Sequence, residues 1–204
     1  LGLCLESLGE LPQALTAFNT CLTLSDLLKG TVLVSVGRVL DRLGRPNEAL
    51  KAYEQALEHA EKNKRDEVRI SALNNMAWIY LTAQPATVRD YDRAAILARQ
   101  AYEATAPDDV YALETLALAE LRVRNYEAAR RSSMQGLEAD AGSRWSIMIR
   151  AWAELELGNR RVATDLRARF SKMAADQDPP DLALDELVDQ FDKRVAATYG
   201  GRRP

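Results

Sequence analysis

The side chains that most often carry out catalysis or bind metals are scarce in this 204-residue sequence. It has one histidine, His59, and two cysteines, Cys4 and Cys21. Nucleophilic catalysis needs a nucleophile beside a base, and zinc needs several thiolate or imidazole ligands at set spacings. His59 has Glu58 and Glu61 as neighbours near the end of a predicted helix, where we expect it to be solvated. No metal-ligand spacing and no glycine-rich phosphate loop is present. We therefore expect no enzymatic activity, no cofactor and no metal within these residues.

The two cysteines fall in segments that are expected to face each other in one helical hairpin. Two cysteines form no disulfide framework, and cysteine is among the most frequently buried residue types. Buried free thiols are the favoured interpretation, and close approach of the two thiols is the alternative.

Charge and hydropathy exclude two classes of partner. The 27 Lys and Arg residues against 30 Asp and Glu leave a net charge of −3, and the richest basic run, 160–169, is diluted by Asp165 and apolar residues. Phosphate backbones are bound by clustered cations, so we expect no nucleic-acid binding. No apolar stretch approaches the roughly 18 residues of a membrane span, and no signal peptide is visible. We expect no membrane insertion and a cytoplasmic location, with further sequence upstream because the chain starts inside a predicted helix.

A short turn followed by a helix start recurs along the chain. The alanines that follow these turns are Ala14, Ala49, Ala94, Ala129 and Ala163, spaced 35, 45, 35 and 34 residues apart. Apolar residues recur between the turns with helical spacing, and no long stretch alternates as a strand would. Each unit is therefore predicted to be two antiparallel helices. The predicted helices are 1–8, 12–25, 30–43, 47–62, 67–83, 91–105, 109–123, 126–139, 143–157, 160–174 and 181–198.

This pattern resembles the tetratricopeptide repeat family, in which W-x2-L-G-x2-Y…A-x3-F…P recurs about every 34 residues. The best-matching unit is the second, with Leu33, Val36, Gly37, Leu40, Ala49 and Tyr53. The fifth unit is the weakest, because Arg150, Glu154 and Arg167 stand where the family is apolar. The resemblance implies an all-α, right-handed superhelical solenoid of antiparallel helix pairs. It covers residues 1–175 with the first repeat incomplete, and leaves 176–204 as a C-terminal amphipathic capping helix and tail.

The family binds partners, often peptides or helices, in a concave groove lined by the first helix of each pair. The resemblance therefore implies a non-catalytic scaffold or adaptor for a protein or peptide, with self-association as a further possibility. The alternative is the regulatory or targeting arm of a larger enzyme or regulator whose active domain lies upstream. The residues placed in the groove are Arg38, Arg42, Asn74, Trp78, Tyr111, Glu114, Leu118, Trp145, Met148 and Trp152.

The aromatic members of this groove set suggest an apolar anchor on the partner, because Trp and Tyr dominate binding hot spots. Burial of these side chains against neighbouring helices is the alternative. Arg38 and Arg42 would attract an acidic ligand to one end of the groove.

The last amphipathic segment, 181–200, has Asp181 placed to cap its start and an apolar face. This face consists of Leu184, Leu187, Val188, Phe191 and Val195. We predict that the helix covers the exposed end of the fifth hairpin, since a solenoid end without a cap leaves apolar surface in water. The alternatives are that it folds back into the groove as an internal ligand or docks on another molecule.

Overall fold

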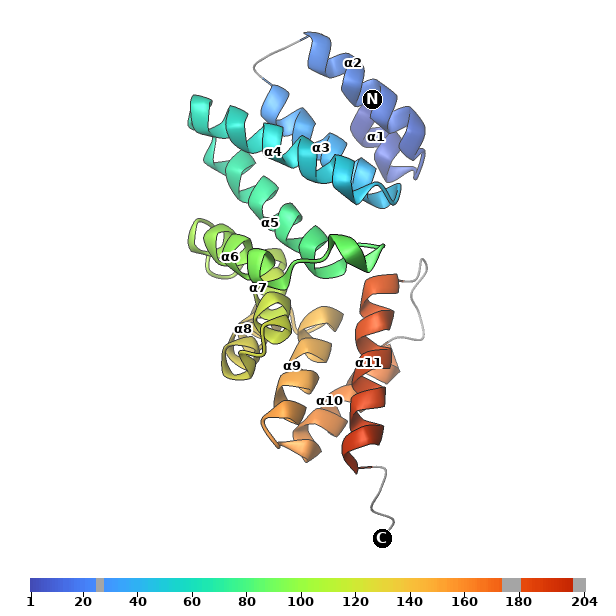
Figure 1. Ribbon diagram of the computed structural model, residues 1–204, viewed down its shortest axis with the longest axis vertical. Coiled ribbons are helices and arrows are strands. Elements are labelled where there is room, and N and C mark those ends of the chain that lie inside the picture. The colour runs from blue at the N-terminus through green and yellow to red at the C-terminus, as the bar shows by residue number, and fades with distance from the viewer. Residues whose placement is uncertain (25–27, 174–180, 200–204) are drawn as a thin grey trace. The chain divides into compact units, whose positions relative to one another are not determined.

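The computed structural model describes residues 1–24, 28–173 and 181–199 (Figure 1). These residues form eleven α-helices and one 3₁₀ helix, with no strand among them, which confirms the all-α prediction. Each α-helix lies within a few residues of its predicted range. The helices are α1 (Gly2–Ser7), α2 (Leu11–Leu24), α3 (Lys29–Arg42), α4 (Pro46–Asn63), α5 (Asp66–Thr82), η1 (Ala86–Val88), α6 (Tyr91–Glu103), α7 (Val110–Arg122), α8 (Tyr126–Ala139), α9 (Arg144–Glu156), α10 (Arg160–Met173) and α11 (Leu182–Tyr199).

The chain forms two compact units, which we call unit 1 (Leu1–Pro107) and unit 2 (Asp108–Pro204). Unit 1 contains the hairpins α1–α2, α3–α4 and α5–α6, and unit 2 contains α7–α8 and α9–α10 followed by α11. Within each unit the second helix of one hairpin packs on the first helix of the next, as α4 does on α5 and α8 on α9. Each unit is therefore a stack of antiparallel helix pairs.

The hairpin turns end where the sequence places residues that tolerate a left-handed backbone. Gly9, Gly44 and Gly158 have φ values of 78°, 70° and 85°. Glycine reaches this region without the Cβ clash that penalises other residues, so each helix can stop and its successor can reverse direction. Arg124 occupies the same position in the fourth hairpin with φ of 61°. Pro179 and Pro180, which precede the last predicted helix, lie outside the described residues.

Small residues in the first helices admit the aromatic rings of the second helices. A Cβ added to Gly37 would lie 2.5 Å from the ring of Tyr53, and one added to Gly2 would lie 2.6 Å from the ring of Phe18. Tyr53 is only 1% exposed, and this burial raises the pKa of its hydroxyl. The close approach means that a side chain at either glycine would clash with the ring beside it.

Two polar departures from the repeat pattern are compensated inside unit 2. Glu120 is buried, and its Oε2 accepts a hydrogen bond of 2.7 Å from Oγ of Ser132 on the facing helix. Glu154, in the equivalent position of the next hairpin, is buried and accepts a 2.7 Å hydrogen bond from Nδ2 of Asn159. Buried carboxylates are tolerated when they are hydrogen-bonded, so the weak fifth match still folds as a helix pair.

The expectation for the cysteines is partly wrong. Cys4 and Cys21 are both free, but Cys4 is exposed and Cys21 is only half-buried. The reason is that α1 packs closely with α2 alone among the described helices, so the side of α1 that carries Cys4 faces solvent. In the described residues we find no helix that is both long and apolar enough to cross a membrane.

Candidate protein-binding surfaces

The groove residues predicted in unit 1 lie on two first helices that are neighbours in the stack. Arg38 and Arg42 belong to α3, and Asn74 and Trp78 belong to α5. The backbones of α3 and α5 approach each other. We call these four residues the unit 1 face.

The two arginines of the unit 1 face converge on one buried carboxylate. Arg38 donates from Nε to Oε1 of Glu6 at 2.6 Å and from Nη2 to Oε2 at 2.8 Å. Arg42 donates from Nη1 to the backbone carbonyl of Glu6 at 3.2 Å. The Glu6 hydrogen bonds raise the pKa of Arg38. The arginines therefore join α3 to α1, and an acidic ligand would compete with Glu6 for them.

Asn74 and Trp78 supply the other half of the unit 1 face. Both side chains are half-buried. The Oδ1 atom of Asn74 is buried and has no hydrogen-bond partner within the described structure. Among the described residues, the close backbone neighbours of α5 are α3, α4, α6 and η1, all of which belong to the hairpin stack. A buried acceptor beside an indole ring can therefore receive a backbone N–H and an apolar side chain from another molecule.

The predicted groove residues of α7 differ strongly in exposure. Tyr111 is 77% exposed, whereas Leu118 is 1% exposed. Glu114 is half-buried, and its Oε1 accepts a 2.5 Å hydrogen bond from Oγ of Ser143, the N-cap of α9. Burial, helped by the nearby Asp140 and Asp181 carboxylates, raises the pKa of Glu114, and the Ser143 hydrogen bond opposes that rise.

The predicted groove residues of α9 are covered. Met148 and Trp145 are 0% and 9% exposed, and Trp152 is half-buried. They lie at the first-helix positions predicted from the repeat, but this face of unit 2 is not an open groove. Helix α11 contacts Trp145 and Trp152 on this face, and we had predicted only that it covers the end of the fifth hairpin. The sequence signal for this packing was the apolar face of α11. Such a face indicates that the helix packs on an apolar surface but not on which one.

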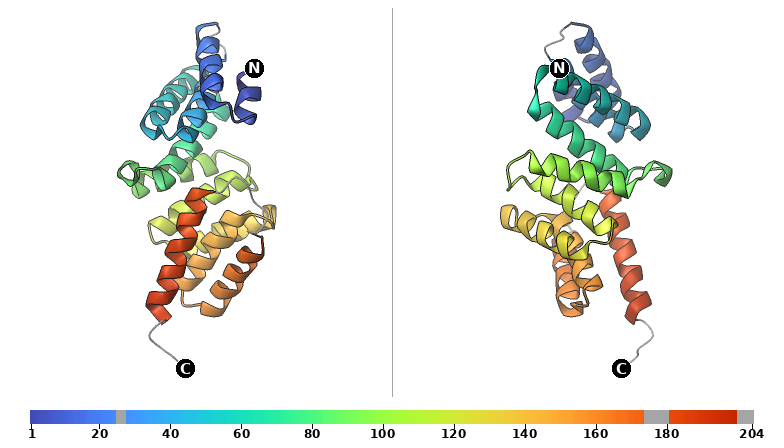
Figure 2. Two further views of the ribbon diagram at one scale, coloured as in Figure 1. Left: turned by 90° about the vertical axis from the view of Figure 1, so that its right-hand side faces the viewer. Right: turned by 60° about the vertical axis from the view of Figure 1, so that its left-hand side comes forward.

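Helix α11 runs alongside α9 and parallel to it (Figure 2). At its start, Asp181 accepts a 2.9 Å hydrogen bond from Nε1 of Trp145 and also caps α11 through Leu184 N at 3.1 Å. Further along, the ring of Phe191 meets that of Trp152 edge-on, with centroids 6.3 Å apart. Each of these contacts joins α11 to a predicted groove position.

Polar contacts connect α11 to α9 and also to α7 and α10. Arg194 pairs with Glu156 at the end of α9, at 2.7 and 3.0 Å. On one side Gln190 accepts a 2.8 Å hydrogen bond from Arg122 of α7, and on the other Asp192 pairs with Arg167 of α10 at 2.7 Å. Helix α7 belongs to the preceding hairpin. Within the described residues, the close packing that joins α8 to α9 has no counterpart between α10 and α11.

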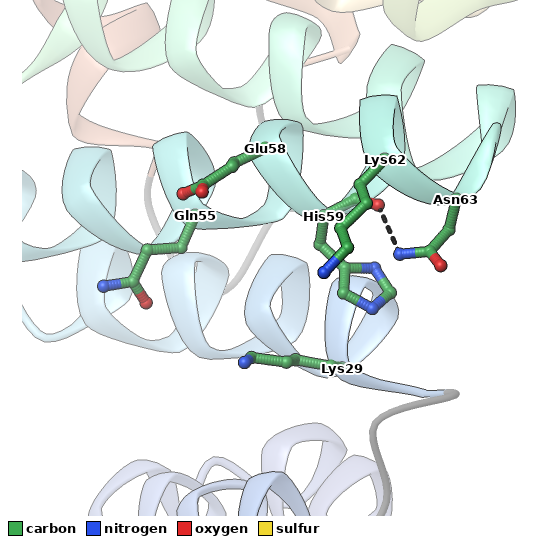
Figure 3. A pocket seen from close by; sticks show the side chains of 6 residues that line it. All are labelled: Lys29, Gln55, Glu58, His59, Lys62 and Asn63. Atoms are coloured by element: carbon green, nitrogen blue, oxygen red, sulfur yellow. Dashed lines mark hydrogen bonds between the residues drawn. The ribbon is translucent and has the colours of Figure 1, made fainter.

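Hollows also lie elsewhere in unit 1. A polar one of about 370 Å³ is lined by Lys29 of α3 and by residues of α4 that include Glu58, His59 and Lys62 (Figure 3). The ring of His59 fits there because Gly30 has no side chain, since a Cβ would lie 2.9 Å from Nδ1. Among the described residues, no cluster of three or more His, Cys, Asp or Glu side chains could hold a metal ion. An apolar hollow of about 530 Å³ lies between α1, α2 and α3 and is bordered by Phe18.

Comparison with known proteins identifies the repeat. The sequence model of the tetratricopeptide repeat family matches residues 1–62. No curated protein matches this sequence. Several solved structures share the fold. PilF of Pseudomonas aeruginosa aligns with a TM-score of 0.67 at 18% identity, over 99% of this chain and 90% of PilF. MamA of Desulfovibrio magneticus RS-1 aligns at 0.66 and 15% identity, over 87% of this chain and 93% of MamA. YrrB, a tetratricopeptide repeat protein with an unusual peptide-binding site, aligns at 0.63 and 17%, over 94% of this chain and 88% of YrrB.

Proposed function

We propose that this chain, whose residues 1–62 match the tetratricopeptide repeat model and whose described residues share the fold of solved tetratricopeptide repeat proteins, is a non-catalytic protein-interaction scaffold. The unit 1 face binds a segment of a partner protein. The observation that carries this proposal is the buried, unsatisfied Oδ1 of Asn74 one helical turn from the half-buried ring of Trp78 on α5.

The chemistry of the unit 1 face describes the segment it takes. An unsatisfied buried acceptor is costly, and a backbone N–H of an extended segment would satisfy Asn74 Oδ1. The half-buried ring of Trp78 offers apolar area at small entropic cost, so the segment carries an apolar or aromatic anchor. Arg38 and Arg42 already hold Glu6, so an acidic group on the segment adds specificity only by displacing that pair. The peptide-binding site of YrrB, which shares the fold, supports this mode of use.

Peptide selection on the full chain tests the proposal whatever the natural partner is. A displayed library of random linear peptides is selected against the wild-type protein, and dissociation constants of the selected peptides are measured for variants. We expect a shared apolar anchor, and a loss of affinity of about tenfold or more with Trp78→Ala, as for a hot-spot residue. Asn74→Ala should lower the affinity of the protein for the same peptides.

The matched control is Ile96→Ala on α6, an exposed apolar residue of unit 1 away from the first helices. It should leave the affinity unchanged. Circular dichroism and the thermal midpoint of each variant show whether the folded fraction is intact. Selected peptides whose binding survives both Trp78→Ala and Asn74→Ala would contradict the proposed surface.

A further inference from the structure

Helix α11 presents a complete apolar stripe to the first-helix face of unit 2. Leu184, Leu187 and Phe191 are 1%, 0% and 1% exposed, although the helix meets closely only α9 among the described helices. Leu182, the first residue of α11 and off this stripe, is 77% exposed. The burial is therefore selective for one side of an amphipathic helix, as in a helix bound in a groove.

The polar contacts show which positions of a bound helix this face recognises. An acidic residue at the start of the helix meets the indole N–H of Trp145, and a basic residue more than three turns later meets Glu156. Gln190 and Asp192 meet Arg122 and Arg167 on either side of the stripe. The contact with Arg122 reaches back to the hairpin before the last one, which a helix stacked only on the end of the fifth hairpin would not do.

We infer that the first-helix face of unit 2 is a helix-binding surface and that α11 is its occupant in cis. The face takes an amphipathic helix of defined chemistry: an acidic N-cap residue, apolar residues at the spacing of Leu184, Leu187 and Phe191, and a basic residue one turn after the aromatic. A partner helix with this pattern binds only by displacing α11. This inference concerns unit 2 and does not depend on binding at the unit 1 face.

The displacement has a definite consequence for affinity. A tethered occupant competes at a high effective concentration, commonly millimolar, so a free helix meets a face that is almost always filled. Weakening α11 in cis therefore strengthens binding in trans without adding any new contact. This behaviour separates an occupant from a structural cap, whose loss exposes apolar surface and lowers stability.

The experiment uses the full chain and a fluorescent peptide with the sequence of residues 181–199, followed by anisotropy. We expect weak binding to the wild type, and binding at least about tenfold tighter to Phe191→Asp, whose own α11 is loosened. Asp185→Ala, on the exposed side of α11, is the matched control and should bind like the wild type. Adding Trp152→Ala to Phe191→Asp should remove the gain. Equal binding by the wild type and a folded Phe191→Asp variant would overturn the inference, and so would a gain that survives Trp152→Ala.

A charge exchange keeps the test decisive if Phe191→Asp does not fold. In the Glu156→Arg chain, Arg194 of α11 is repelled, and a peptide that carries Arg194→Glu becomes the better occupant. We expect this chain to prefer the altered peptide by about tenfold or more and the wild-type chain to prefer the unaltered one. Absence of any reversal would overturn the inference. Sedimentation across a range of concentrations is the last control, because a wild-type dimer that Phe191→Asp dissolves would place α11 on a second copy and overturn occupancy in cis.

Discussion

Arg38 on α3 donates two hydrogen bonds to the buried carboxylate of Glu6 on α1, from Nε at 2.6 Å and from Nη2 at 2.8 Å. The side chain of Glu6 is only 9% exposed, whereas that of Arg38 is 43% exposed. The pair therefore fastens the short helix α1 to the rest of unit 1.

Loss of Arg38 should destabilise the fold because it leaves a buried carboxylate with only Arg42 nearby. We expect Arg38→Ala to lower the free energy of unfolding by about 1–2 kcal/mol, less than for a fully buried pair because Arg38 is partly solvated. Urea unfolding followed by circular dichroism measures this. Arg45→Ala removes the equally close but exposed pair with Glu48 and should leave the midpoint unchanged. If the two variants behave alike, the Glu6 pair has no structural role.

Stability should depend on pH through Glu114. Burial raises the pKa of its carboxyl above the ordinary 4.5, so the folded state binds the proton more tightly than the unfolded state. The resulting stability is present below pH 4.5 and is lost as the pH rises through the folded pKa. Glu114→Gln, which stays neutral, should therefore raise the free energy of unfolding at pH 7, and the gain should vanish in acid. Urea midpoints between about pH 3 and pH 7 would reveal it.

Glu156 is a control, because the pKa of its carboxyl is shifted in the opposite direction. The hydrogen bonds from Arg194 lower the pKa of its carboxyl, so its contribution is present above pH 4.5 and is lost as the pH falls through the folded value. Glu156→Gln should be less stable than the wild type at pH 7 and match it in acid. The Glu114 interpretation fails if both variants shift stability in the same direction at pH 7.

Gly37 should not tolerate a side chain. A Cβ would lie 2.5 Å from the ring of the buried Tyr53. We expect Gly37→Ala to lower the free energy of unfolding by about 1–3 kcal/mol, since overpacking outweighs the better helix propensity of alanine. Gly44→Ala is the comparison, because its Cβ would meet nothing and it suffers only from a left-handed backbone of φ 70°. Differential scanning calorimetry ranks the two, and an equal or smaller loss for Gly37→Ala would contradict tight packing.

Tyr111 should be dispensable for folding. Its side chain is 77% exposed near the start of α7. We expect Tyr111→Ala to change the free energy of unfolding by less than about 0.5 kcal/mol, as for most surface substitutions. Phe170→Ala, which removes a buried ring from the same unit, should cost about 3–5 kcal/mol. A Tyr111 variant as unstable as the Phe170 variant would mean that the ring is part of the core.

The repeat pattern was enough to predict the helices and their pairing. Alanines such as Ala49 and Ala129 recur at near-constant spacing, and both are completely buried in the structure. Local rules account for this success. Helical periodicity, glycines at the turns and Asp181 at a helix start depend on residues that are close in the chain.

The state of the candidate surfaces was decided by tertiary structure. Nothing in the sequence near Arg38 indicates that its partner is Glu6, which lies 32 residues away. In the same way, periodicity placed Trp145 and Trp152 on the first-helix side of unit 2 but could not show that α11 contacts them there. Periodicity reports which side of a helix is apolar, and an amphipathic helix gains the same burial on any apolar surface it can reach. Which surface it covers depends on the three-dimensional path of the chain, and here that path sets Phe191 against Trp152.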